Sequence, residues 1–159
     1  MKILFLDIDG VLNSRAYDRT RNWNEQTDID ETRLPFVKKI IDATGAKIVL
    51  SSTWREHWDK TNEKCDADGV YINKAFAKFG LEIYDKTPDL GLKFDRPDEI
   101  KAWLESTQER IEKFAIIDDY SYGWGSLSDC FVKTNPHFGL GLEEEHVLKA
   151  ISILNDGTR

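Results

Sequence analysis

The sequence has little of what secreted or membrane-spanning proteins usually contain. Its 159 residues include only two cysteines, Cys65 and Cys130, which have no paired spacing. A disulfide framework or a zinc site is therefore not expected, and we predict two reduced thiols. No apolar run approaches the length of a membrane span, and Asp7 ends the first run, residues 3–6, too early for a signal peptide. We expect a cytoplasmic protein that does not associate with membranes.

The charge balance is acidic, with 29 Asp and Glu residues against 22 Lys and Arg, giving a net charge of -7. This balance disfavours broad non-specific binding of nucleic acid, although a local patch would still allow a specific contact. Abundant carboxylates fit metal binding equally well, but most should be solvated surface. With 40% hydrophobic residues the chain can bury a core, so residues 1–159 are predicted to form a single domain.

Short apolar segments alternate along the chain with helical patterns. The segments predicted as strands are 2–7, 46–50, 114–117, 130–133 and the less apolar 81–84. Helices are predicted over 34–43, 70–79, 97–105 and 143–154. The alternation predicts a three-layer, Rossmann-like α/β domain with a mainly parallel sheet flanked by helices. The polar and irregular segment 13–33 is predicted to be a loop or flap.

Oxygen-bearing side chains follow three of the predicted strands. These are Asp7 and Asp9 after the first strand, Ser51 and Ser52 after the second, and Asp118 and Asp119 after the strand at 114–117. Ligands in open α/β folds bind outside the carboxyl ends of the strands, so these side chains should converge at one edge of the sheet.

The converging groups suit phosphate chemistry that depends on a metal. A crowded set of carboxylates is tolerable mainly around a hard cation, and an oxygen-only set without His or Cys favours Mg²⁺. One carboxylate can attack phosphorus and form an aspartyl-phosphate, while a second acts as acid and base. Lys93 and Arg96, just before a predicted helix start, could balance the charge of the transferring group.

A second D-x-D-G-V string, containing Asp66 and Asp68, has a different context. It follows a polar stretch rather than an apolar strand, and it lacks the later ligands of a calcium loop. One of the two aspartates is predicted to cap the helix that begins near Val70. The three histidines share no metal-ligand spacing, so surface or supporting roles are predicted for them: His57, His137 and His146.

The four motifs together resemble a known family. The string Asp7-Ile8-Asp9-Gly10-Val11, then Ser51, then a basic residue before a helix, and finally Asp118-Asp119 follow the order found in the haloacid dehalogenase (HAD) superfamily of phosphotransferases. The segments IVLSSTWR, RPDEIKAWL and IIDDY also resemble small stand-alone HAD domains related to those of nucleic-acid end-repair proteins.

This resemblance implies catalytic roles for the first two aspartates. Asp7 would be the nucleophile and a Mg²⁺ ligand. Asp9 would be the general acid and base, with its backbone carbonyl on the metal. Asp118 and Asp119 would complete the metal site, and Asp119 is favoured as the direct ligand.

The resemblance also implies residues that bind the phosphoryl group. Ser51, with Ser52 beside it, would hold this group. Arg96 is slightly favoured over Lys93 as the basic partner, because its place before the helix fits the family spacing better. Both are kept as candidates.

The segments between the motifs are too short for a large cap domain, so the resemblance is to capless members. An open site suits a protruding phosphorylated substrate: a nucleic-acid end, a nucleotide or a phosphoprotein. Four residues could stack on a base: Tyr17, Trp23, Trp54 and Arg55.

The predicted function is a Mg²⁺-dependent phosphomonoesterase that acts through an aspartyl-phosphate. The alternative is a non-catalytic phosphate- or partner-binding domain of the same fold. A receiver domain of two-component signalling also uses such a cluster, but the order of the motifs argues against it.

Overall fold

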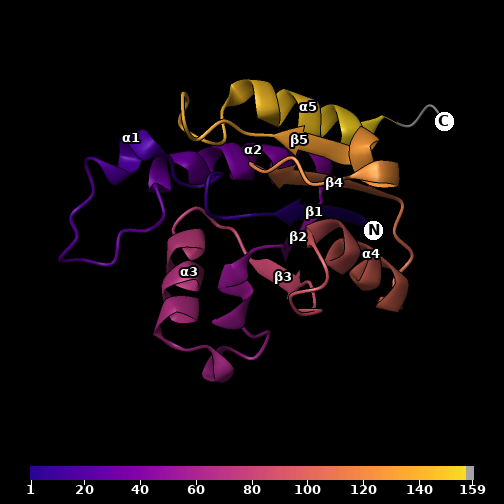
Figure 1. Cartoon of the computed structure of the whole chain (residues 1–159), viewed down its shortest axis with the longest axis horizontal. Helices are drawn as coiled ribbons and strands as arrows, with labels where there is room; N and C mark the ends of the chain where they lie inside the picture. The colour runs from indigo at the N-terminus through magenta and orange to yellow at the C-terminus, as the bar shows by residue number, and fades with distance from the viewer. Residues whose placement is uncertain (157–159) are drawn as a thin grey trace.

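A parallel five-stranded sheet forms the centre of the molecule, with strand order β3-β2-β1-β4-β5 (Figure 1). The structure is a computed structural model that describes residues 1–156. The strands are β1 (Lys2–Leu6), β2 (Lys47–Leu50), β3 (Ile83–Lys86), β4 (Lys113–Asp118) and β5 (Phe131–Lys133). Each pair of neighbouring strands is parallel, which confirms the predicted sheet.

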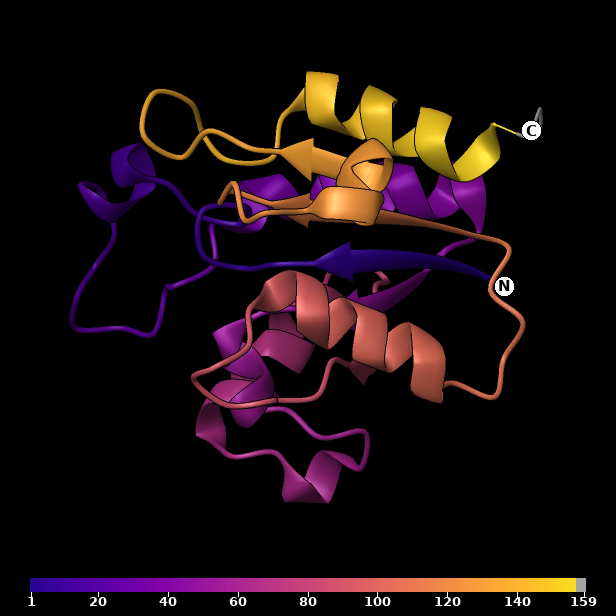
Figure 2. The same cartoon turned by 45° about the vertical axis from the view of Figure 1, so that its right-hand side comes forward.

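Helices cover both faces of the sheet, giving the three layers that the sequence predicts (Figures 1 and 2). One face packs against α2 (Leu34–Thr44), α3 (Ala67–Ala77) and α5 (Glu144–Asn155), and the other packs against α4 (Arg96–Ser106) and the 3-10 helix η4 (Gly125–Cys130). Strand β1 divides its side chains between the two layers, with Leu4 and Leu6 on the first face and Phe5 on the second. All three are fully buried, which explains the continuous apolar run of this strand.

The segment between β1 and α2 forms a long excursion beside the sheet (Figure 1). It contains the short helix α1 (Arg15–Asp18) and the 3-10 helix η1 (Glu31–Arg33), neither of which is predicted from the sequence. The hydroxyl of Tyr17 donates hydrogen bonds to the backbone carbonyls of Thr27 and Ile29, which closes the excursion on itself. The segment between β2 and α3 holds only η2 (Thr53–Glu56) and η3 (Asn62–Lys64), so the domain has no large cap.

The bounds of α3 and of β3 differ most from those expected. Helix α3 begins at Ala67, three residues before Val70, because Asp66 accepts hydrogen bonds from the backbone N–H groups of Asp68 and Gly69. Strand β3 covers Ile83–Lys86 rather than 81–84. No helix within residues 1–156 is both long enough and apolar enough to span a bilayer.

Candidate active site

Parallel pairing places the three predicted motifs side by side at the carboxyl edge of the sheet. Asp7 directly follows β1, and its backbone N–H donates to the carbonyl of Ile117 in β4 at 3.1 Å. The backbone N–H of Ser51 donates in turn to the carbonyl of Leu6 at 2.9 Å. The strand register therefore brings Ser51 and the acidic end of β4 to opposite sides of Asp7.

Three carboxylates form a compact acidic cluster, which consists of Asp7, Asp118 and Asp119. One carboxyl oxygen of each lies within 4.8 Å of one from each of the others. Burial and the nearby charge of Asp118 raise the pKa of Asp7 to about 8, against the opposing effect of Arg96. Burial also raises the pKa of Asp118 to about 6. Without a cation, the cluster therefore favours holding protons.

The acidic cluster fits a magnesium ion in its chemistry. All of its side-chain donors are carboxylate oxygens, which Mg²⁺ prefers. Oδ2 of Asp118 is buried and accepts no hydrogen bond from any described residue, so it is free to bind a cation. Gly10 makes room for the cluster, because a Cβ on Gly10 would lie 2.3 Å from Oδ2 of Asp119.

The side chain of Asp9 lies outside the acidic cluster and is held by two donors. Nε1 of Trp54 donates to its Oδ2 at 3.1 Å, and Nδ2 of Asn13 donates to its Oδ1 at 3.0 Å. Oδ1 of Asn13 accepts from the backbone N–H of Gly10 at 2.7 Å, which fixes the turn after β1. The predicted acid and base is thus an exposed carboxylate with a defined orientation.

The structure brings Arg96, and not Lys93, to the acidic cluster. Nη1 of Arg96 lies 3.5 Å from Oδ1 of Asp7 and 3.8 Å from Oδ2 of Asp118. The Arg96 side chain is buried, and Nη1 makes no hydrogen bond with any described residue. Lys93 is exposed, on the loop before α4. Arg96 is therefore the cation placed to balance charge at Asp7.

Two buried ion pairs that were not predicted support Arg96. Glu99, one turn further along α4, lies 3.7 Å from Nε of Arg96 and 2.7 Å from Nη2 of Arg55. All three side chains are buried. Burial raises the pKa of Glu99, against the opposing effect of the two guanidinium groups. The spacing of Arg96 and Glu99 on one helix was the only available signal.

The two serines after β2 have different surroundings. Ser52 caps η2, with its Oγ accepting from the backbone N–H of Trp54 at 3.3 Å. Ser51 is buried beside Asp7, and its predicted contact with a phosphoryl group stays a prediction. Of the two hydroxyls, that of Ser52 already serves as a helix cap.

The four residues expected to stack on a base differ in their surroundings, and Trp23 is the one that is exposed. Arg55 is buried in its ion pair, contrary to expectation, and Tyr17 holds the excursion after β1 together. The indole N–H of Trp54 donates a hydrogen bond to Asp9. Trp23 is 71% exposed, with the guanidinium of Arg21 stacked 3.6 Å from its ring centroid.

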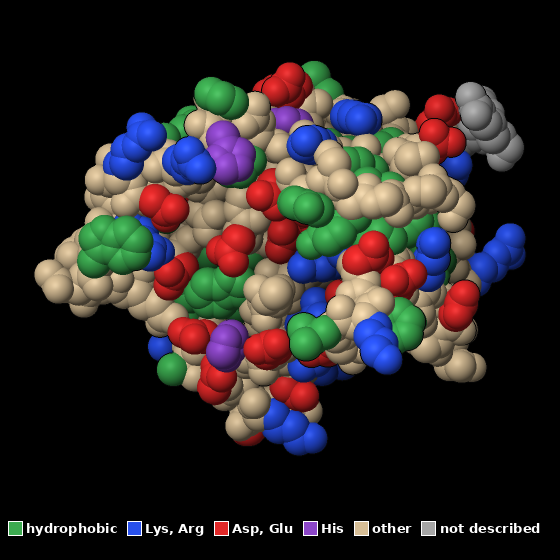
Figure 3. All heavy atoms as spheres, viewed as in Figure 1, with side chains coloured by type: hydrophobic (Ala, Val, Ile, Leu, Met, Phe, Trp, Pro, Cys, Tyr) green, Lys and Arg blue, Asp and Glu red, His purple; other side chains and the backbone are tan. Residues whose placement is uncertain are grey.

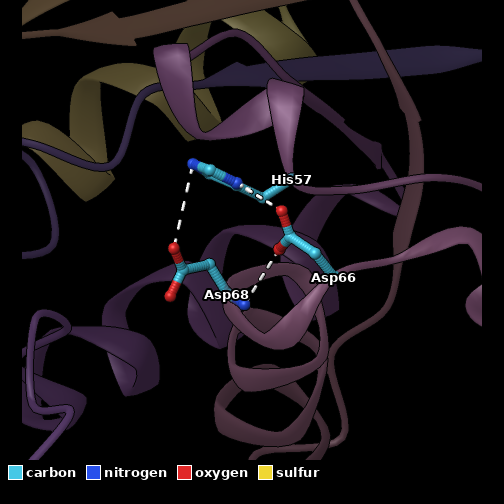
Figure 4. Close-up of side chains that lie close together, drawn as sticks. All are labelled: His57, Asp66 and Asp68. Atoms are coloured by element: carbon cyan, nitrogen blue, oxygen red, sulfur yellow. Dashed lines mark hydrogen bonds and ion pairs between the residues drawn. The ribbon is translucent and has the colours of Figure 1, made fainter.

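His57 lies close to the second D-x-D-G-V string, although its position in the sequence shows no metal-ligand spacing. Figure 4 shows His57 between Asp66 and Asp68, with Nδ1 2.6 Å from Oδ2 of Asp66. Asp66 also caps α3, and Asp68 accepts a hydrogen bond from Gln26. These contacts join η2 and the excursion after β1 to the start of α3, which gives the group a structural role and confirms the helix cap.

Comparison with known proteins confirms the resemblance that the motifs indicated. The family model for the HAD domain in Swiss Army Knife RNA repair proteins matches residues 3–147, which include all three members of the acidic cluster. No curated protein and no solved structure matches the chain significantly. The chain therefore belongs to the family of HAD domains found in Swiss Army Knife RNA repair proteins.

Proposed function

We propose that this chain is a Mg²⁺-dependent phosphatase that removes a terminal phosphate monoester through an aspartyl-phosphate on Asp7, and that residues 1–159 act as a single domain. Family membership supports a HAD-type phosphatase in general. The observation that carries the finer proposal is the acidic cluster, with Arg96 3.5 Å from Asp7. It combines a nucleophile, a cation site and a fixed positive charge at one strand end.

In the first proposed step, a carboxylate oxygen of Asp7 attacks phosphorus, and the bond from phosphorus to the ester oxygen breaks. Asp9 gives a proton to the departing oxygen, so the alcohol leaves uncharged. Trp54 and Asn13 hold Asp9 in place for this transfer. Arg96 balances the charge of the reacting carboxylate and phosphoryl group.

In the second proposed step, Asp9 takes a proton from a water molecule, which attacks the phosphorus of the aspartyl-phosphate. The bond to Asp7 breaks, inorganic phosphate is released and the carboxylate is restored. Asp7, Asp118 and Asp119, with the backbone carbonyl of Asp9, would hold Mg²⁺. When bound, this ion neutralises negative charge on the phosphoryl oxygens.

The proposed substrate is the phosphorylated end of an RNA strand. The printed description of the family concerns RNA repair proteins, and the site has no large cap that would exclude a polymer. A phosphate at the end of an RNA chain projects from it, so it can reach a site that opens to solvent at the ends of the β-strands. Asp9, Asn13, Trp54 and Asp119 line a cavity of about 450 Å³ at this opening.

Release of inorganic phosphate tests the proposal. Purified protein should release it from p-nitrophenyl phosphate and from RNA oligonucleotides carrying a 3′- or 5′-terminal monophosphate, only when Mg²⁺ is present. Asp7→Asn should abolish release while the protein stays folded. Activity that survives this substitution would rule out Asp7 as the nucleophile.

The alternative is a domain of the same fold that binds a phosphorylated partner without turnover. The large hydrophobic side chains exposed on loops at this edge of the sheet would serve such a role equally well. Tight, Mg²⁺-dependent binding of phosphorylated RNA by the wild-type protein, with no phosphate released from any of these substrates, would favour that alternative.

A further inference from the structure

Most of the large exposed hydrophobic side chains lie on the edge of the sheet at which the candidate active site is found. Among the described residues, six of the seven lie on loops that follow strands at the carboxyl edge, and Leu148 on α5 is the exception. The six are Trp23, Leu92, Phe94, Tyr120, Phe138 and Leu140. Such a set of exposed side chains is typical of a surface that binds a macromolecule rather than a small metabolite.

A groove leads away from Asp119 on the β5 side of the opening of the candidate active site. It has a volume of about 910 Å³ and lies between the loop after β4, the loop after β5 and the first turns of α5. Its lining includes Asp119, Tyr120, Lys133, His137, Phe138 and Lys149. We call it the β5 groove.

The β5 groove carries unpaired positive charge close to the acidic cluster. Within residues 1–156, neither Lys133 nor Lys149 forms an ion pair. The carboxylates of the groove are Asp119 and Glu145, and Glu145 lies 3.6 Å from Nε2 of His146. Figure 3 shows blue and purple side chains near the start of α5, above a hollow lined by red ones.

The opposite side of the opening is less suited to a polyanion. The cavity there is lined by four carboxylates, those of Asp9, Asp18, Asp28 and Asp119. Two arginines also line it, Arg15 and Arg21, of which Arg21 is already paired, at 2.5 Å from Asp28 and 3.8 Å from Asp18. A phosphodiester chain that leaves the site would therefore meet less repulsion along the β5 groove.

The β5 groove also offers aromatic faces for stacking. Tyr120 is 61% exposed, and its ring lies 4.6 Å from that of Tyr122, which packs edge-on against the buried Trp124. Phe138, across the groove, is 96% exposed. Exposed rings beside unpaired lysines are what single-stranded nucleic acid binds, because bases stack while phosphates pair with cations.

We propose that the β5 groove binds the nucleotides next to the terminal phosphate of a single-stranded RNA, with Lys133 and Lys149 at internal phosphates and Tyr120 and Phe138 against bases. This inference rests on the proposed function, which places the terminal phosphate at Asp7. It predicts that the protein prefers an oligonucleotide over a nucleoside monophosphate. It also predicts that the preference depends on residues outside the acidic cluster.

The test compares two values of kcat/KM, one for a phosphorylated RNA oligonucleotide and one for the matching nucleoside monophosphate. Replacing both lysines, Lys133→Ala with Lys149→Ala, should lower the ratio of these values about tenfold or more. For the oligonucleotide, the slope of log kcat/KM against log salt concentration should become shallower by about 1.4 in this double variant. Each contact with a single-strand phosphate contributes about 0.7 to that slope. Lys64→Ala with Lys74→Ala, which removes the same charge from exposed sites far from the groove, should leave the ratio unchanged.

Binding of a fluorescent phosphorylated oligonucleotide, measured by anisotropy, keeps the groove testable even if no substrate turns over. The double variant at Lys133 and Lys149 should bind at least about tenfold more weakly than the wild type. An unchanged affinity, or a ratio of kcat/KM near one in the wild type, would overturn the inference while leaving phosphatase activity intact. Equal preference for a phosphopeptide of the same charge would also overturn it. Absence of phosphate release from every substrate would instead count against the proposed function.

Discussion

The indole N–H of Trp54 donates a hydrogen bond to Oδ2 of Asp9 across 3.1 Å, linking the segment after β2 to the turn after β1. The sequence separates these residues by 45 positions. The contact gives the proposed acid and base a fixed orientation, which a flexible exposed carboxylate would lack. Trp54 is therefore a positioning residue for Asp9.

Trp54→Phe removes this N–H while keeping an aromatic ring. We expect kcat/KM for a nucleotide monoester to fall about tenfold, since a well-placed general acid contributes about a hundredfold or more. The value for p-nitrophenyl phosphate should fall less, because nitrophenolate leaves without needing a proton. Trp103→Phe is the control, since it also removes an indole N–H, the one that donates to Asp85 at 3.0 Å. Equal losses on both substrates would contradict the positioning role.

Gly10→Ala should damage the acidic cluster as well as the backbone. Gly10 has φ +79, which costs a side-chain-bearing residue about 1–2 kcal/mol, and the new Cβ would meet Asp119 at 2.3 Å. Gly45→Ala, at φ +68 with nothing within 4 Å of the new Cβ, should show the backbone cost alone. Thermal unfolding with and without Mg²⁺ should show a smaller Mg²⁺ effect for Gly10→Ala only. A full Mg²⁺ effect in Gly10→Ala would contradict the cation site.

Glu99→Gln should destabilise the protein and weaken its activity. It leaves the guanidinium groups of Arg55 and Arg96 buried without their shared carboxylate, and breaking such a pair costs about 3 kcal/mol. Urea unfolding measures the loss. Glu105→Gln, on an exposed position of the same helix, should change stability by less than about 0.5 kcal/mol. Matching results for the two variants would show that the ion pair contributes nothing.

The stability of the protein without metal should fall as the pH rises from about 4 to about 8. Over this range folded Asp7 and Asp118, with pKa values raised to about 8 and about 6, still bind protons that the unfolded chain has released. Mg²⁺ can replace these protons, so its stabilising effect should grow with pH. Melting curves in EDTA and in Mg²⁺ across this range show whether the stabilisation by Mg²⁺ grows or shrinks as the pH rises. A Mg²⁺ effect that shrinks as the pH rises would be inconsistent with binding at the acidic cluster.

Local patterns were enough to predict the sheet, because β1, β2 and β4 are buried on both faces and read as unbroken apolar runs. Strand β3 lies at the sheet edge and is only partly buried, so its apolar pattern is weak and the predicted range began two residues too early. The start of α3 was missed because Asp66, rather than the apolar pattern, determines it.

The candidate site was predictable where its residues end strands, since topology alone brings Asp7 and Asp118 together. The contacts that support these residues depend on how distant segments pack. Asn13 precedes no apolar pattern, Trp54 could equally have been a pocket wall, and Arg55 meets Glu99 only when α4 docks on the sheet. No local spacing contains that information.

The phosphorylated form of Asp7 tests the central claim most directly. Protein carrying Asp9→Asn, which should slow hydrolysis of the intermediate, is mixed with Mg²⁺ and p-nitrophenyl phosphate labelled in its phosphoryl group, whose leaving group needs no proton, then quenched in acid and mapped by peptide mass spectrometry. The account predicts one phosphoryl group on the peptide containing Asp7 and none when Asp7→Asn is added. Label on another residue, or turnover by the wild-type protein with no label on Asp7, would contradict it.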